Sequence, residues 1–166
     1  MDLSAYFQPV NVEGKYLGDG DFYTNIASAT QIYTNENLFP DLEGVSLALI
    51  GVCDENGSPQ NQGCKDAPDE IRRFLYPLAL PVDNMKMVDL GNIIAGNTPE
   101  DTRFAVTEVL YKLIEKNITV IILGGSQDLS LANYKAYEVL GRVVNIASID
   151  AMLDLGNDRA PLSNRN

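Results

Sequence analysis

The stretch VIILGGSQDLSLANY, residues 120–134, predicts a buried strand that runs into a glycine turn and then a helix. In open α/β sheets, the turn after a buried strand is a common position for binding and catalytic groups. This turn offers Ser126, Gln127 and Asp128, but no histidine, lysine or cysteine. The stretch therefore predicts an α/β fold, and it leaves open which groups could act at the turn.

Strands and helices are predicted to alternate from about residue 45 onward. Short apolar runs predict strands over residues 46–52, 85–90, 118–123 and 142–150. Between them, helices are predicted from Asp66 or Ala67 to a close at Pro77 and Pro81, over residues 98–117, and from near Asp128 to about Leu140. This alternation predicts a mainly parallel sheet with crossover helices.

The apolar spacing within the first two of these helices predicts which side chains face the core. The predicted buried residues of the first helix are Ile71, Phe74, Leu75 and Leu78. Those of the second are Val106, Val109, Leu110 and Leu113, with Thr98 as its cap and Pro99 as its first residue. Both helices are thus expected to pack against the sheet.

Residues 1–44 show no such alternation. They contain one predicted short helix over residues 23–33, and we expect this part to pack over the domain as an N-terminal arm. Residues 45–166 form the predicted α/β domain. A chain of 166 residues can form one domain with a substantial core but not two ordinary ones.

Composition excludes several classes of partner. No run reaches the roughly 18 apolar residues of a membrane span. The N-terminal sequence MDLSAYFQPVNVEG lacks the features of a signal peptide, so we expect a cytoplasmic protein that binds no membrane. A net charge of −11 argues against nucleic acid as a partner, because phosphate backbones repel acidic surfaces.

The chain contains no histidine, which excludes Ser-His-Asp and Cys-His catalysis and histidine metal sites within it. Its two cysteines, Cys53 and Cys64, match no zinc-binding pattern. A disulfide between them is possible, but two reduced thiols are favoured in a cytoplasmic protein. Cys53 is better explained as a small buried residue than as a nucleophile, since no base lies near it in the sequence.

Two turns at predicted strand ends are candidate sites. The turn GGSQDLS, residues 124–130, could bind phosphate through backbone amides, but it lacks the lysine of a phosphate loop. Its glycines could equally serve only to permit a tight turn. In IDAMLDLG, residues 149–156, Asp150 and Asp154 could together bind a divalent cation such as Mn²⁺ or Mg²⁺. The alternative is that one carboxylate caps the next segment and the other is solvated.

Four stretches in this order resemble the arginase/ureohydrolase superfamily, which includes arginase, agmatinase and formimidoylglutamase. They are LALIGVCDENGSPQNQGCKDAPDEIRRFL, VDLGNI, VIILGGSQDLS and NIASIDAMLDL, in residues 47–75, 88–93, 120–130 and 145–155. The first matches the family pattern at Gly51, Asp54, Gly63, Ala67, Pro68, Ile71 and Arg72. The resemblance covers about residues 45–156, and the N-terminal arm is most similar to the formimidoylglutamase-like branch.

The resemblance implies a three-layer α/β/α sandwich with two bridged Mn²⁺ ions at the strand ends, where a hydroxide attacks a guanidino or formimino carbon. In the family motif Gly-Gly-Asp-His, the histidine is a metal ligand, and here Gln127 stands in its place. In the motif Asp-Ala-His-x-Asp, Asp150 and Asp154 match ligands, but Met152 replaces the histidine. A neutral amide or a thioether is a poor ligand for a hard cation.

The candidate metal ligands, as a weak and degenerate set, are Asp150, Asp154, Gln127 and Asp128. Family members are roughly twice as long as this chain. We therefore expect the N-terminal part of a longer, formimidoylglutamase-like protein that binds a divalent cation weakly or not at all and is not catalytic as given. Two alternatives stay open. The full-length parent could hydrolyse linear guanidino or formimino C–N bonds, or it could be a pseudoenzyme that acts as a ligand-binding or assembly module. The resemblance also implies a homo-oligomer.

Overall fold

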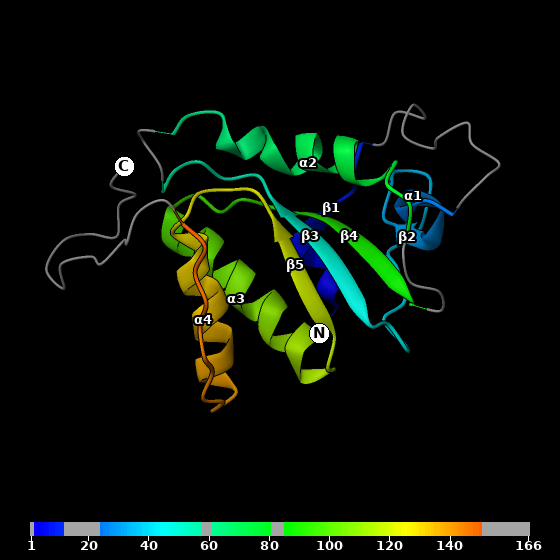
Figure 1. Cartoon of the computed structure of the whole chain (residues 1–166). Coiled ribbons are helices and arrows are strands. Elements are labelled where there is room, and N and C mark those ends of the chain that lie inside the picture. Colours follow the sequence, from blue (N-terminus) through cyan, green and yellow to red (C-terminus); the bar gives the residue numbers. More distant parts are fainter. Residues whose placement is uncertain (1, 12–23, 58–60, 81–84, 151–166) are drawn as a thin grey trace, which may run out of the picture.

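A sheet between two helical layers forms the part of the chain that the computed structural model describes, residues 2–11, 24–57, 61–80 and 85–150 (Figure 1). Its strands are β1 (Phe7–Gln8), β2 (Thr30–Ile32), β3 (Leu47–Val52), β4 (Met87–Ile93) and β5 (Thr119–Leu123). Helix α2 (Ala67–Leu75) covers one face, α3 (Pro99–Glu115) covers the other, and α4 (Leu129–Val139) packs beside α3. None of the described helices is long and apolar enough to cross a membrane.

The sheet is mainly parallel, with the order β1-β4-β3-β5. β3 pairs in parallel with both β4 and β5, so that Leu47 lies opposite Met87 on one side and Thr119 on the other. β1 and β2 share the outer edge of β4, the first antiparallel and the second parallel to it. The predicted α/β/α sandwich with a mainly parallel sheet is confirmed.

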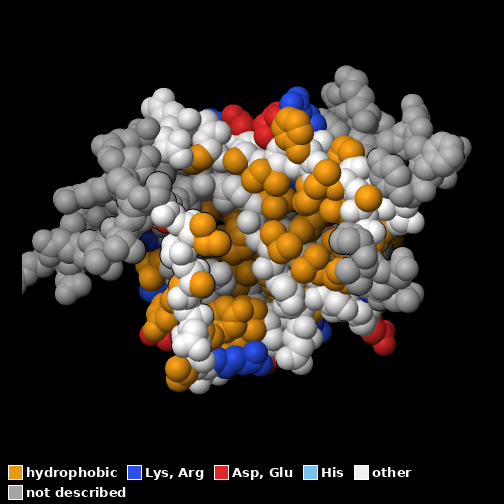
Figure 2. Space-filling model, viewed as in Figure 1, with side chains coloured by type: hydrophobic (Ala, Val, Ile, Leu, Met, Phe, Trp, Pro, Cys, Tyr) orange, Lys and Arg blue, Asp and Glu red, His pale blue; other side chains and the backbone are white. Residues whose placement is uncertain are grey.

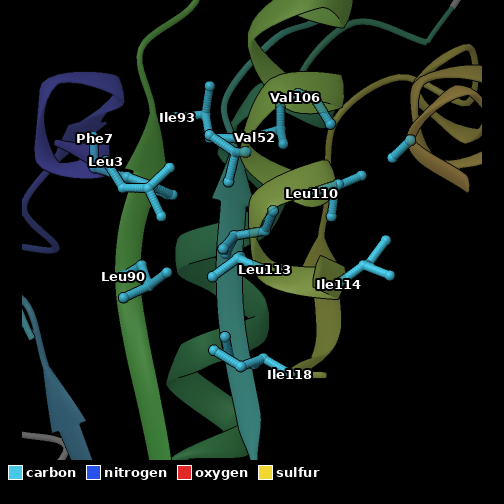
Figure 3. Packing of buried hydrophobic residues seen from close by; sticks show 14 of the residues in the cluster. Leu3, Phe7, Val52, Leu90, Ile93, Val106, Leu110, Leu113, Ile114 and Ile118 are labelled. Carbon is cyan, nitrogen blue, oxygen red and sulfur yellow. The ribbon is translucent and has the colours of Figure 1, made fainter. Parts of the chain in front are cut away.

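The larger apolar core lies between the sheet and α3. Figure 3 shows side chains of α3, among them Leu110 and Leu113, next to those of β3 and β4. All four residues of the predicted stripe on α3 are at most 1% exposed, which confirms that prediction. The helix begins as the sequence predicts, because the Thr98 side chain accepts a hydrogen bond from the amide of Asp101 and the Asp101 carboxylate accepts one from the amide of Thr98.

The prediction for the buried face of α2 is wrong for three of its four residues, whereas Leu75 is half-buried and packs against an apolar cluster that includes Leu49. Phe74 is 65% exposed and Leu78 55% exposed, and Ile71 also faces solvent. The side that faces the sheet carries Arg72 and Tyr76, which are almost completely buried. The cause is Asp89 in the middle of β4, since a buried carboxylate requires charged and hydrogen-bonding partners, and α2 supplies them by rotating its polar residues inward.

The segment before residue 45 contributes to the sheet as well as packing on it. Leu3–Tyr6 form a 3-10 helix that leads into β1, and α1 spans only Ile26–Ala29 before the chain continues as β2. The helix predicted over residues 23–33 is therefore wrong for its second half. Thr30–Ile32 form a strand because the open edge of β4 offers them backbone partners, and tertiary pairing outweighs the local preference.

The strand predicted over residues 142–150 is also wrong. The segment has no strand partner in the structure, and Val143 and Ile149 are fully exposed. Apolar β-branched residues favour a strand only where a neighbouring strand pairs with them, and the segment lies along α4 instead of beside β5 (Figure 1). Its exposure leaves an apolar surface next to the β5 side of the sheet.

Candidate functional site

The carboxyl ends of β3 and β5 meet at one edge of the sheet, as the parallel arrangement requires. Beyond β3 the chain continues into Cys53 and Asp54, and beyond β5 it enters the glycine turn. The amide of Ser126 donates a hydrogen bond of 3.1 Å to the carbonyl oxygen of Asp54, which ties the two loops together.

The glycine turn has a steric reason for its two glycines. Gly124 and Gly125 have φ values of 66° and 82°, in the left-handed region. A Cβ on Gly124 would lie 2.6 Å from the Pro68 ring, and one on Gly125 would lie 2.9 Å from the carbonyl oxygen of Val52. The glycines are therefore needed for the turn itself, which supports the conformational explanation over a phosphate site.

Asp128, one of the predicted ligands, is buried and already paired. Its carboxylate accepts a hydrogen bond of 2.6 Å from Nη1 of Arg103 and a short one from the Ser126 hydroxyl. Gly57 of the β3–α2 loop packs directly against the same carboxylate, leaving no room for a side chain. For Asp128 to bind a cation it would first have to release Arg103, so its present role is to hold α3 and the turn together.

Gln127 and Asp150 come together although 23 positions separate them in the sequence. Nε2 of Gln127 donates a hydrogen bond of 3.0 Å to Oδ2 of Asp150. Both side chains are exposed, on the side of the turn that faces away from the core. The structure thus brings together Gln127 and Asp150, the two positions at which the family resemblance implies metal ligands. At this contact an amide N–H faces a carboxylate.

The described residues at this point do not fit a bridged pair of Mn²⁺ ions. In the described part of the chain, no three His, Cys, Asp or Glu side chains are grouped closely enough to hold a metal ion. With its N–H directed at Asp150, the Gln127 amide leaves only its neutral carbonyl oxygen for a cation, and a neutral amide is a weaker ligand than imidazole. Met152 and Asp154, the other motif positions, lie outside the described residues.

A buried charged network lies beneath the strand ends, and sequence reasoning missed it. Arg72, 2% exposed, donates from Nε and Nη2 to the two carboxylate oxygens of Asp89 at 2.8 and 2.9 Å. Nη1 donates to Oδ1 of Asn92 at 2.6 Å, and the Tyr76 hydroxyl donates to Asp89 at 2.9 Å. The available signal was an aspartate inside an apolar strand, which requires a buried partner.

The same network explains a glycine in β3. A Cβ on Gly51 would lie 1.9 Å from Oδ1 of Asn92 and 3.0 Å from Nη1 of Arg72. The strand predicted over residues 85–90 extends further in the structure, as β4 to Ile93, so that Gly91 and Asn92 lie inside it. The side chains of Arg72, Asp89 and Asn92 therefore hold α2 on the sheet. They are buried and bind one another, so they are not available to a ligand.

Both cysteines are free in the structure. Burial, with a smaller contribution from the Asp69 carboxylate, raises the pKa of the Cys53 thiol to about 11. Burial and the carboxylate of Glu55 also raise the pKa of Cys64. A neutral thiol is a weak nucleophile, so the structure supports the prediction that Cys53 is a packing residue.

We expect iodoacetamide to alkylate Cys53 slowly at about pH 8, with a rate that keeps rising up to about pH 11, because only the thiolate reacts. The rate is measured by mass spectrometry in a Cys64→Ser variant, with the same variant unfolded in urea as the control. A rate that already levels off near the pKa of an ordinary cysteine would show that the thiol is not shielded.

Comparison with known proteins places these features in a family. The arginase family model matches residues 45–165. A formimidoylglutamase from Photorhabdus laumondii is 32% identical over 126 residues, which cover 70% of this chain and 39% of that protein. Formiminoglutamase from Trypanosoma cruzi, solved with Mn²⁺, is 25% identical and superimposes with a TM-score of 0.52 over 60% of this chain and 37% of its own.

The fold is shared with a further solved structure, formimidoylglutamase from Bacillus subtilis, which is 18% identical and has a TM-score of 0.60 over 81% of this chain and 42% of its own. The chain thus spans about two fifths of the length of the relatives that it matches. The match runs through β3, α2, β4, α3, β5 and α4, which are the elements that form the strand-end turns. The chain belongs to the arginase family.

Proposed function

We propose that this chain is the N-terminal part of a formimidoylglutamase-like protein of the arginase family, carries a degenerate metal centre, and does not hydrolyse guanidino or formimino bonds by itself. The proposal rests on one observation, the hydrogen bond from Nε2 of Gln127 to Oδ2 of Asp150. A metal centre would need a strong lone-pair donor at residue 127, but the amide directs its N–H at the carboxylate and leaves only a neutral carbonyl oxygen for a cation.

Three further features support the proposal that the metal site of the family has been lost in this chain. Ser126 replaces the motif aspartate, and its hydroxyl bonds to Asp128. Asp128 is paired with Arg103, so the nearest additional carboxylate is not available to a cation. The glycine turn is fully accounted for by its packing against Pro68 and Val52. On this proposal, the chain keeps the two glycines of the family motif, Gly124 and Gly125, but has lost the histidine that binds the metal.

The test is metal content, measured by mass spectrometry on protein purified in Mn²⁺. We expect less than one ion per chain in the wild type and no change in an Asp150→Ala/Asp154→Ala variant. About two ions per chain, lost in that variant, would contradict the proposal. A Gln127→His/Met152→His variant serves as the positive control, because it restores imidazole ligands at both motif positions and should raise Mn²⁺ affinity.

A second candidate function is that a longer parent protein is a metal-dependent hydrolase of linear C–N bonds, such as those of formimino or guanidino compounds. The observation that favours it is that Asp150 keeps a motif carboxylate at the strand-end turn, within reach of residue 127. In that case Mn²⁺, where bound, would supply an activated hydroxide. Release of product from formiminoglutamate by a longer protein with stoichiometric Mn²⁺ would establish this function.

A further inference from the structure

The loop between β3 and α2 contains the sequence Asn56–Gly57, and Asn56 is the only asparagine of the chain that is followed by glycine. Asparagine is a chemically labile residue, because the amide nitrogen of the next residue can attack its side-chain carbonyl carbon. A side chain on that next residue hinders the attack, and glycine has none. Asn56 therefore has less steric protection against this reaction than any other asparagine in the sequence.

Neither reacting group of this pair is held by a hydrogen bond within the described part of the chain. The amide of Gly57 donates to none of the described residues, although backbone N–H groups are nearly always paired. The side chain of Asn56 has no hydrogen-bond partner among them either, and it is exposed. The backbone amide of Asn56 donates to Oδ1 of Asp54 at 2.8 Å, which shapes the turn but involves neither reacting atom. The attack therefore breaks none of these hydrogen bonds.

The packing of the loop explains why glycine follows Asn56. A Cβ on Gly57 would lie 2.1 Å from Oδ1 of Asp128. The same carboxylate is held in place by Nη1 of Arg103 at 2.6 Å, so it cannot move aside without losing its charged partner. A residue with a side chain at position 57 would thus disturb the contact between the loop and the glycine turn. The fold itself requires the residue that makes Asn56 reactive.

We propose that Asn56 is a site of spontaneous modification, at which the side-chain amide is converted through a cyclic imide to aspartate and isoaspartate. The nitrogen of Gly57 loses its proton and forms a bond to Cγ of Asn56, while the bond from Cγ to the side-chain nitrogen breaks and ammonia leaves. Water then opens the five-membered ring at one of its two carbonyl carbons. One opening gives aspartate, and the other gives isoaspartate, whose main chain is one carbon longer. Water is the only co-reactant, and nothing is oxidised or reduced.

The position of the loop gives water access to this ring. In Figure 1 the chain leaves the carboxyl end of β3 toward the left of the view, and Figure 2 shows the hydrophobic side chains of this face gathered nearer the middle, over the sheet. Asn56 and Asn61, on either side of the turn, are both exposed. All atoms that react belong to two adjacent residues, so the reaction needs no group from another segment.

The modification changes the loop in two ways. It adds one negative charge to a chain whose net charge is −11, next to the carboxylates of Asp54 and Glu55. Isoaspartate also lengthens the backbone between Asp54 and Gly57, which displaces Gly57 from the carboxylate of Asp128. We expect the hydrogen bond from the amide of Ser126 to the carbonyl oxygen of Asp54, 3.1 Å long, to open more often as a result. Neither Asn56 nor Gly57 is a candidate metal ligand, so this inference does not depend on the proposed function.

The experiment incubates the purified chain at physiological temperature and mildly alkaline pH and follows each asparagine by fragmentation mass spectrometry. We expect the mass gain of an amide-to-acid conversion at Asn56, with isoaspartate among the products and a rate that rises with pH, because the attacking nitrogen must lose its proton. Asn61 is the internal control, since it is exposed in the same loop but is followed by Gln62. A rate at Asn56 no faster than that at Asn61 would overturn the proposal.

An Asn56→Gln variant provides the matched control, because its side chain would have to close a six-membered ring and should stay unmodified over the same period. Amide hydrogen exchange at Ser126 then tests the structural consequence. We expect incubated wild type to lose protection there, incubated Asn56→Gln to keep it, and fresh Asn56→Asp, which adds the charge without the longer backbone, to lose less than the wild type. Equal protection in incubated wild type and Asn56→Gln would show that the modification does not loosen the loop.

Discussion

Replacing Arg72 by methionine should lower the free energy of unfolding by about 3–5 kcal/mol, because it leaves the carboxylate of Asp89 buried without its counter-charge. Asp89 is 0% exposed, and Arg72 donates to both of its oxygens. Methionine fills a similar volume, so the loss comes from the charge and not from a cavity. Urea denaturation followed by circular dichroism measures the difference.

The control is the neighbouring arginine on the same helix. Arg73 forms an ion pair with Glu70 at 3.4 Å, with both side chains about half exposed. Arg73→Met should cost less than about 1 kcal/mol, since exposed pairs contribute little. Adding Asp89→Asn to Arg72→Met should recover part of the loss by removing the unpaired charge. Equal effects at Arg72 and Arg73 would show that the buried network does not hold α2 on the sheet.

Replacing Gly124 by alanine should lower the free energy of unfolding by about 2–5 kcal/mol, from two separate causes. The left-handed backbone, with φ at 66°, costs an alanine roughly 1–2 kcal/mol. The added methyl group would also lie 2.6 Å from Cδ of Pro68 and 2.9 Å from its nitrogen, and overpacking against such a rigid neighbour costs about 1–3 kcal/mol more. Denaturation in urea again provides the measurement.

Gly141→Ala separates the two causes. Gly141 has a nearly identical φ of 64°, but no atom lies within 4 Å of the position that a Cβ would take. Its replacement should therefore cost only the roughly 1–2 kcal/mol of the left-handed conformation. If both variants lost the same stability, the close packing of the turn on the start of α2 would have no energetic weight.

The sequence predicted those elements whose local signals agree with their tertiary surroundings. α3 has a cap, a proline at its first position and a continuous apolar stripe, and all of these are found in the structure. The face of α2 was predicted wrongly because its apolar periodicity was followed, while the decisive interaction was with Asp89, on another strand. The segment 142–150 has strand-forming residues but no partner, and pairing is not a property of the segment alone.

The candidate site was predicted in its position but not in its contacts. The meeting of the β3 and β5 loops follows from parallel strands, and the structure shows it in the hydrogen bond between Ser126 and Asp54. The pairing of Gln127 with Asp150 and of Asp128 with Arg103 could not be predicted, because each joins segments more than twenty residues apart. Side-chain partners across such distances depend on how the helices pack.

The outer side of β4 is protected against pairing with a strand of another molecule. Because β1 and β2 occupy the outer side of β4, strand addition at that end would have to build on segments of two and three residues. That end of the sheet therefore offers an incoming strand only short runs of backbone to pair with. Very short edge strands of this kind are one way in which soluble proteins keep a sheet from pairing with the sheet of a neighbouring molecule.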